Sequence, residues 1–212
     1  MTKRLKHIAP SIIAKNQGEL EEKLDRVKDF AKVIHLDVMD GNFVQNESLN
    51  FDFILPELPC RVEAHLMVRY PEKWIAKNYR KADLIQVHYE TCKSLPKLCK
   101  FLKQHKKQVG LVLNPETKVS DVSDKLKYFD QVLVMTVNPG FYGSPFLKEN
   151  LDKIYEIKQL RKGIEVEVDG GITDKTIKYA RDAGADVFVS GSYVMKAENP
   201  EEAFNKLQSL LK

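Results

Sequence analysis

The sequence has few cysteines and no long hydrophobic run. Its three cysteines, Cys60, Cys92 and Cys99, form an odd and sparse set without the spacing of a zinc finger or a disulfide framework. Reduced thiols of this kind are typical of the cytosol, so we expect a cytoplasmic protein. No run of about 18 apolar residues occurs, and the sequence therefore predicts no membrane-spanning helix and no membrane partner.

Charge of one sign is not in large excess either. The formal net charge is +4, and the densest basic patch, KQHKK (103–107), has no aromatic residues interleaved with it. Nucleic-acid-binding domains usually combine a concentrated basic surface with a recognisable binding motif. The scattered lysines are typical of a solvated surface, and we expect no nucleic-acid partner.

Short β-rich runs alternate with charged, amphipathic segments along the whole chain. The runs cover residues 7–13, 33–39, 61–68, 83–89, 108–114, 131–137, 164–170 and 186–192. This alternation predicts an α/β protein with a (β/α)8 TIM barrel, in which residues 1–212 form a single compact domain. A doubly wound sheet is the alternative. It would usually need a glycine-rich loop after the first strand, where this chain has Pro10-Ser11.

Polar residues gather at the ends of these runs, where a barrel carries its chemistry. Strand alternation places His35 and Asp37 of the stretch VIHLDVMDGNF (33–43) on one face. His65 lies in the third run and Asp169 near the end of the seventh. Imidazole and carboxylate groups together suit zinc, iron, manganese or cobalt, so these residues predict a divalent metal site. The alternative is that each side chain is hydrogen-bonded separately in the core, but four at corresponding strand ends favour a site.

Glycine-rich segments follow the last three strands. They are NPGFYGSPF (138–146), DGGIT (169–173) and SGSYV (190–194). Backbone N–H groups with no side chain in front of them, at the late loops of a barrel, form a cradle for phosphate. Each glycine alone is typical of an ordinary turn, but three such segments together favour a phosphate site.

A metal beside two carboxylates, with phosphate held at the opposite rim, predicts a phosphorylated polar substrate. A metal ion that polarises a ketone and binds the neighbouring hydroxyl acidifies the carbon between them. Asp37 and Asp169 could then remove a proton from one face of that carbon and return one on the other, which inverts the centre. The methionines at 39, 67 and 135 could line such a site, although core packing explains them equally well.

Seven motifs, in this order along nearly the whole chain, resemble those of the ribulose-phosphate 3-epimerase family. They are IAPSI (8–12), IHLDVMDG (34–41), HLMV (65–68), LVLNPET (111–117), VMTVNPGF (134–141), EVDGGI (167–172) and VSGS (189–192). The resemblance implies a TIM-barrel isomerase of the pentose phosphate pathway. It would interconvert D-ribulose 5-phosphate and D-xylulose 5-phosphate through an enediolate. Members of the family are commonly oligomeric, so a homo-oligomer acting on a small sugar phosphate is expected.

The resemblance also implies roles for single residues. The metal ligands would be His35, Asp37, His65 and Asp169, with Asp37 as proton acceptor and Asp169 as proton donor. The implied substrate-binding positions are Ser11, His65, Gly140, Phe141, Tyr142, Gly143, Asp169, Gly170, Gly171, Gly191 and Ser192. The chain departs from the usual family pattern at Asn42, Gln45, Tyr142 and Ser144. These departures leave the four ligands intact and concern substrate length and affinity more than reaction type.

Three other functions compete with this interpretation. A hexulose 6-phosphate 3-epimerase, such as an allulose 6-phosphate enzyme, would use the same metal ligands and the same acid–base pair. Related phosphate-barrel decarboxylases and aldolases carry an Asp-x-Lys-x-x-Asp strand motif, and LDVMDG (36–41) has no lysine at the required place. A non-catalytic sugar-phosphate binder would need neither proton-transfer carboxylate.

Tyr142 gives rise to a prediction about substrate length. If its side chain turns into the phosphate cradle, it shortens the span between metal and phosphate, which favours a five-carbon sugar. One extra carbon unit is worth roughly 1–3 kcal/mol, so we expect kcat/KM to favour pentulose 5-phosphate over hexulose 6-phosphate by about tenfold to two-hundredfold. Assays of both sugars with the wild type and Tyr142→Gly check this. Equal use of the two sugars, or a hexulose preference, would overturn the substrate assignment.

Overall fold

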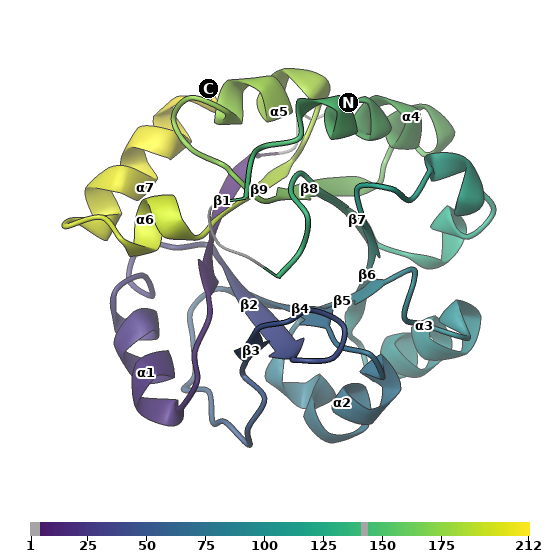
Figure 1. Ribbon diagram of the computed structural model, residues 1–212, viewed down its shortest axis with the longest axis horizontal. Coiled ribbons are helices and arrows are strands. Elements are labelled where there is room, and N and C mark those ends of the chain that lie inside the picture. The colour runs from purple at the N-terminus through teal and green to yellow at the C-terminus, as the bar shows by residue number, and fades with distance from the viewer. Residues whose placement is uncertain (1–4, 141–143) are drawn as a thin grey trace.

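The strands of the protein close into a barrel. The computed structural model describes residues 5–140 and 144–212. Parallel strands pair side by side around the barrel, and the pairing of β1 with β2 closes it (Figure 1). These strands are β1 (His7–Ile12), β2 (Val33–Asp40), β4 (Arg61–Met67), β5 (Leu84–His88), β6 (Gln108–Leu113), β7 (Gln131–Met135), β8 (Glu165–Asp169) and β9 (Val187–Ser190). The predicted (β/α)8 barrel is confirmed, and each predicted run coincides with one of these strands.

Helical segments surround the barrel (Figure 1). The α-helices are α1 (Gln17–Asp25), α2 (Pro71–Asn78), α3 (Leu95–Gln104), α4 (Asp152–Leu160), α5 (Ile177–Ala183), α6 (Ser192–Met195) and α7 (Pro200–Ser209). The 3₁₀ segments are η1 (Tyr79–Lys81), η2 (Val119–Asp121), η3 (Leu126–Tyr128) and η4 (Lys148–Leu151). In the described ranges, no helix combines the length and apolar character needed to cross a bilayer.

Two features of this layout were not predicted. The connection from β6 to β7 contains only η2 and η3 in place of an α-helix. The two-residue strand β3 (Glu47–Ser48) pairs antiparallel with the end of β2, so that Met39 lies opposite Ser48. This pairing folds the segment after β2 back toward the mouth of the barrel.

Helix boundaries follow local capping signals. The side chain of Asn16 accepts a hydrogen bond from the backbone N–H of Glu19 and begins α1. Asn199 does the same for α7, where Pro200 occupies the first turn. These are the residue types that satisfy free N–H groups at a helix start.

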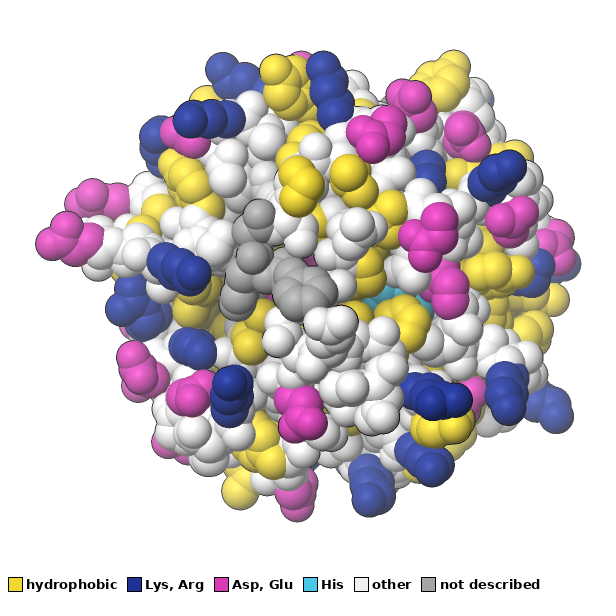
Figure 2. All heavy atoms as spheres, viewed as in Figure 1, with side chains coloured by type: hydrophobic (Ala, Val, Ile, Leu, Met, Phe, Trp, Pro, Cys, Tyr) yellow, Lys and Arg dark blue, Asp and Glu magenta, His cyan; other side chains and the backbone are white. Residues whose placement is uncertain are grey.

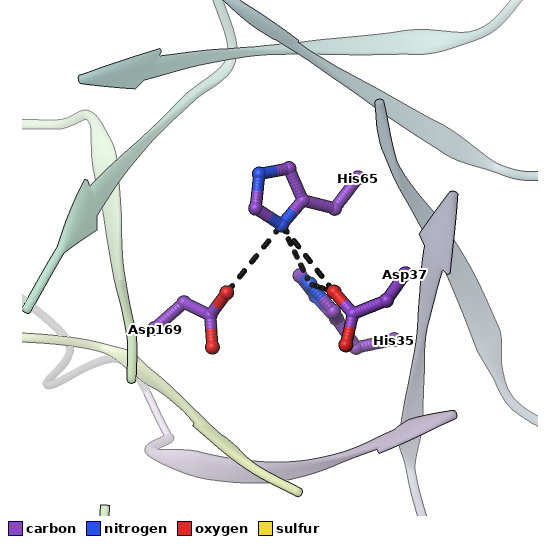
Figure 3. A group of neighbouring side chains, drawn as sticks. All are labelled: His35, Asp37, His65 and Asp169. Carbon is purple, nitrogen blue, oxygen red and sulfur yellow. Dashed lines mark hydrogen bonds and ion pairs between the residues drawn. The ribbon is translucent and has the colours of Figure 1, made fainter. Parts of the chain in front are cut away.

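Side chains of each strand alternate between an outer and an inner core. On β2, Ile34, Leu36 and Val38 are buried in the large hydrophobic cluster between the strands and the helices. The residues between them, including His35 and Asp37, point into the barrel (Figure 3). The two-residue period of a strand therefore delivers the polar side chains of this run to the interior.

A polar network fills part of the barrel interior, where branched apolar side chains are usual. Nε2 of Gln86 donates to Oε1 of Gln131 at 2.7 Å and to Oε2 of Glu167 at 2.6 Å. Nε2 of Gln131 lies 3.3 Å from Oε1 of Glu63, which also pairs with Arg61. These partners offset the large cost of burying carboxylates away from water.

Gly110 of β6 leaves room for this network. A Cβ atom at this position would lie 2.7 Å from Cγ of Gln86 and 3.2 Å from Oε1 of Gln131. We predict that Gly110→Ala lowers the free energy of unfolding by about 1–3 kcal/mol, the usual cost of overpacking a core. Gly163→Ala is the matched control, because a Cβ there would meet no described atom within 4 Å. Urea unfolding compares the variants, and a Gly110→Ala protein as stable as the wild type would contradict this account.

Candidate active site

Four ligand-type side chains converge inside the barrel. His35 and Asp37 come from β2, His65 from β4 and Asp169 from the end of β8 (Figure 3). The strand register brings them together, because Asp37 lies directly opposite His65 in the pairing of β2 with β4. Figure 3 shows Asp169 to the left and Asp37 to the right, both reaching the same nitrogen of His65. The four predicted ligands therefore form one cluster.

The spacing of the cluster matches the shell of a single metal ion. Nδ1 of His65 lies 3.3 Å from Nε2 of His35, 3.5 Å from Oδ1 of Asp37 and 3.4 Å from Oδ2 of Asp169. Nε2 of His35 lies 3.4 Å from Oδ1 of Asp37. A tetrahedral zinc ion with bonds of about 2.0–2.2 Å holds its ligand atoms roughly 3.3–3.6 Å apart. The four donor atoms, all within 4.8 Å of one another, therefore fit one divalent cation.

Charge in the cluster also favours a cation at its centre. Burial alone would raise the pKa of Asp37, but the nearby imidazoles of His35 and His65 hold it well below its ordinary value. Burial would lower the pKa of His65, yet the carboxylates of Asp169 and Asp37 raise it. Within the described ranges, the buried Oδ1 of Asp37 has no hydrogen-bond partner. A positive charge between these groups would satisfy the carboxylates, as a metal ion does.

A cavity of about 330 Å³ opens above the cluster. Asp37 and Asp169 line it, whereas His35 and His65 are buried. The methionines at 39, 67 and 135, expected as a soft lining, also lie on its wall. Figure 2 shows acidic and basic side chains mostly around the edge of the molecular face in view, with a largely hydrophobic or uncharged centre. The cavity therefore joins a polar floor to an apolar wall, as small-molecule sites usually do.

Of the predicted substrate-binding residues that the structure describes, all but His65 line the same cavity. Those that line it are Ser11, Gly140, Asp169, Gly170, Gly171, Gly191 and Ser192. Phe141, Tyr142 and Gly143 lie outside the described residues. Of the departures from the family pattern, Ser144 lines the cavity, while Asn42 and Gln45 are exposed on the segment after β2 and do not. Lys175 also borders the cavity and was not singled out from the sequence.

Two of the rim glycines have a structural requirement of their own. Gly170 has φ of +113°, and a Cβ there would lie 2.3 Å from Cγ2 of Val137. Gly140 has φ of +97°, and a Cβ there would lie 2.7 Å from Cβ of Val44. Other residues rarely adopt these backbone angles, so the positive φ and the close packing together explain both glycines without a ligand.

Buried carboxylates beneath the cluster were missed from the sequence. Oε1 of Glu167 lies 3.1 Å from Nδ1 of His35, and Oε2 of Glu63 lies 3.7 Å from it. Burial and the charge of Glu63 raise the pKa of Glu167 to about 8. The signal that could have found them is spacing. Glu63 and Glu167 each precede a predicted ligand by two residues, which places them on the same strand face one pleat deeper.

His88 was noted as a strand-end residue but not placed in the site. It ends β5 and is completely buried, with Nε2 2.8 Å from Nε2 of His65. Its ring stacks on that of His65, with centroids 5.0 Å apart, and Phe43 packs against it at 4.7 Å. Burial lowers the pKa of His88 to about 4, so the ring is neutral at pH 7.

The fold and this cluster define a class: a (β/α)8 barrel enzyme with a candidate metal centre at the mouth of the barrel. The structure resembles 3-keto-L-gulonate-6-phosphate decarboxylase from Vibrio cholerae with a TM-score of 0.72, covering 99% of this chain and 98% of that one. Their sequences are 12% identical, so the likeness concerns the fold alone.

Closer relatives specify the family. The model of the ribulose-phosphate 3 epimerase family matches residues 7–195. The chain is 35% identical to the ribulose-phosphate 3-epimerase of Aquifex aeolicus, with 98% of this chain and 97% of the relative covered. It is 38% identical to the enzyme of the same name from Synechocystis sp., with 92% and 90% covered. The chain belongs to the ribulose-phosphate 3-epimerase family.

The cluster predicts that metal binding stabilises the folded protein. We expect protein purified without chelator to carry one divalent ion per chain, and chelation to lower its unfolding temperature. Restoring the ion at about 100 times its dissociation constant should return roughly 2.7 kcal/mol. His65→Ala should abolish this stabilisation, whereas the exposed His105→Ala should retain it. Equal metal content in the two variants would contradict the ligand assignment.

Proposed function

We propose that the protein is a metal-dependent sugar-phosphate 3-epimerase that interconverts D-ribulose 5-phosphate and D-xylulose 5-phosphate. Membership of the ribulose-phosphate 3-epimerase family supports the reaction. The observation that carries the proposal is the placement of Asp37 and Asp169 on opposite sides of one cluster, both lining one cavity (Figure 3). Epimerisation requires proton transfer on two faces of one carbon, and two opposed carboxylates meet that requirement.

The residues of the cluster would hold the metal that this reaction uses. His35, Asp37, His65 and Asp169 supply two nitrogen and two oxygen donors, a set that suits zinc, iron, manganese or cobalt. When bound, such an ion would polarise the substrate ketone and acidify the adjacent carbon. The methionines at 39, 67 and 135 on the cavity wall would give the reacting carbon an apolar lining.

The two carboxylates would then move the protons. Figure 3 shows each carboxylate turning one oxygen toward His65 and the other away from it. We propose that Asp37 accepts the proton from the carbon next to the ketone and that Asp169 donates one on the opposite face. The roles exchange in the reverse direction. Contacts with two imidazoles keep Asp37 ionised and therefore able to accept a proton.

The phosphate group would lie at the other end of the cavity. We propose that backbone N–H groups at Gly170, Gly171, Gly191 and Ser192 hold it, with Ser11 contacting the sugar. All of these residues line the cavity together with Asp169. Lys175 on the same rim offers a positive charge to the phosphate. A hexulose 6-phosphate epimerase would use the same groups, and the names of the curated relatives favour the pentulose.

The family suggests an oligomeric state for the protein, and its cysteines suggest a cellular compartment. We propose a homo-oligomer, because members of the family are commonly oligomeric. We also propose a cytoplasmic location, since Cys60, Cys92 and Cys99 are all free thiols. Size-exclusion chromatography with light scattering tests the first proposal.

Asp169→Asn tests the two-carboxylate mechanism. We expect the variant to fold normally and to lose about 10²–10⁴ in kcat, the usual effect of losing a positioned proton-transfer group. Asp174→Asn is the control, because Asp174 lies five residues further along and forms a 2.5 Å ion pair with Lys206. A coupled assay of xylulose 5-phosphate formation measures both variants. The mechanism is wrong if Asp169→Asn binds metal normally and keeps near-full activity.

A further inference from the structure

His65 has a second ring nitrogen, which faces away from the other three side chains of the candidate metal site (Figure 3). Nδ1 of this ring is the atom 3.3–3.5 Å from the other three ligands. Nε2 lies instead 2.8 Å from Nε2 of His88, at hydrogen-bond distance. Two imidazole nitrogens can share a hydrogen bond only if one carries a proton and the other presents a lone pair.

The direction of this hydrogen bond follows from the cluster. A neutral His65 that binds a cation through Nδ1 carries its proton on Nε2, and it therefore donates to His88. Nε2 of His88 must then be the acceptor. A neutral His88 consequently carries its own proton on Nδ1, the nitrogen that faces Oε2 of Glu90 at 3.6 Å.

Glu90 is itself held in place on the far side of His88. Its Oε1 accepts hydrogen bonds from the hydroxyl of Thr117 and, at 3.4 Å, from the backbone N–H of Asn114. Burial alone would raise the pKa of Glu90, but the nearby His88 ring and the hydrogen bond from Thr117 outweigh burial and lower the pKa below its ordinary value. An ionised Glu90 favours the His88 tautomer with its proton on Nδ1.

We propose that His88 and Glu90 are positioning residues for the metal centre, which hold His65 in the tautomer that leaves a lone pair on Nδ1. The inference rests on the metal site of the proposed function. Neither residue lines the cavity above Asp37 and Asp169, so both act through His65. Phe43 packs on the His88 ring, which in turn stacks on His65, so the Phe43 contact restricts the orientation of the His88 ring.

The two histidine ligands differ in how they are supported. Nδ1 of His35 lies 3.1 Å from an oxygen of the Glu167 carboxyl group, so this histidine contacts a carboxyl group directly. For His65 the carboxylate is one imidazole further away, and Glu90 is a quarter exposed where Glu167 is buried. Such outer partners fix the ring orientation of a ligand, and their loss typically costs about 10–100-fold in metal affinity.

Cobalt binding measures this role without reference to turnover. We expect His88→Phe to weaken Co²⁺ binding by about 10–100-fold, because phenylalanine keeps the stacked ring but cannot accept the proton of His65. His88→Gln should recover most of the affinity, since its amide oxygen can accept that hydrogen bond. His105→Phe is the control for replacing an imidazole by a phenyl ring away from the site. Chelator competition gives the dissociation constants, and the visible spectrum of bound Co²⁺ reports the ligand geometry.

Variants of Glu90 provide the same test at a less buried position. Glu90→Gln keeps an acceptor for the Nδ1 proton of His88, whereas Glu90→Met keeps the length of the side chain and removes the acceptor. We expect Glu90→Met to weaken Co²⁺ binding more than Glu90→Gln. This pair decides the matter if His88→Phe does not fold.

Each outcome of these measurements bears on the inference. The inference is supported if the wild type binds Co²⁺, His88→Phe and Glu90→Met bind it more weakly, and the two glutamine variants recover the affinity. If His88→Phe and Glu90→Met both bind Co²⁺ as tightly as the wild type, the positioning role is wrong, while the metal site itself is retained. A wild type that binds no Co²⁺ overturns both. ¹⁵N NMR of the zinc-loaded protein should show His88 protonated on Nδ1, and protonation on Nε2 would contradict the inference.

Discussion

The two-residue period of a β-strand is the constraint on which the rest of this structure depends. Every second side chain of β2, β4 and β8 points into the barrel, so charged residues on these strands must be accommodated there. They form two layers, an upper one around His65 that opens to the cavity and a lower one around Glu167 that is sealed. Buried charges need partners, and that pairing fixes the side chains of the upper layer before any ligand arrives. Catalytic geometry and fold stability therefore share one network.

The barrel and the four-residue cluster could be predicted because both depend on local patterns. Alternating β-rich and amphipathic runs indicate strand number, and the ends of parallel strands meet at one rim. His35 and Asp37 share a face by strand alternation alone. The positions of His65 and Asp169 in two other strand runs added these residues to the predicted site, and the structure brings all four side chains together. Such a fold can be predicted from sequence because the local patterns agree with the global fold.

The remaining features depend on contacts between distant segments, which spacing does not reveal. His88 could be placed at a strand end, but its stacking on His65 depends on the register of β4 with β5. Gln86 and Gln131 have no motif, and their hydrogen bond joins strands 45 residues apart. The antiparallel β3 is too short to show a period. A glycine such as Gly170 can be required for phosphate contact or for its positive φ angle, and a sequence alone cannot separate these two reasons.

The central claim is that two carboxylates act on opposite faces of one carbon, and the fate of a single hydrogen tests it most directly. D-Ribulose 5-phosphate labelled with deuterium at C3 would be converted in ordinary water, and the early product analysed by mass spectrometry. If Asp37 removes the label and Asp169 supplies a different proton, the xylulose 5-phosphate formed should have lost its deuterium at C3. Early product that retains the label at C3 would show that one group returns the same hydrogen, and it would contradict the account.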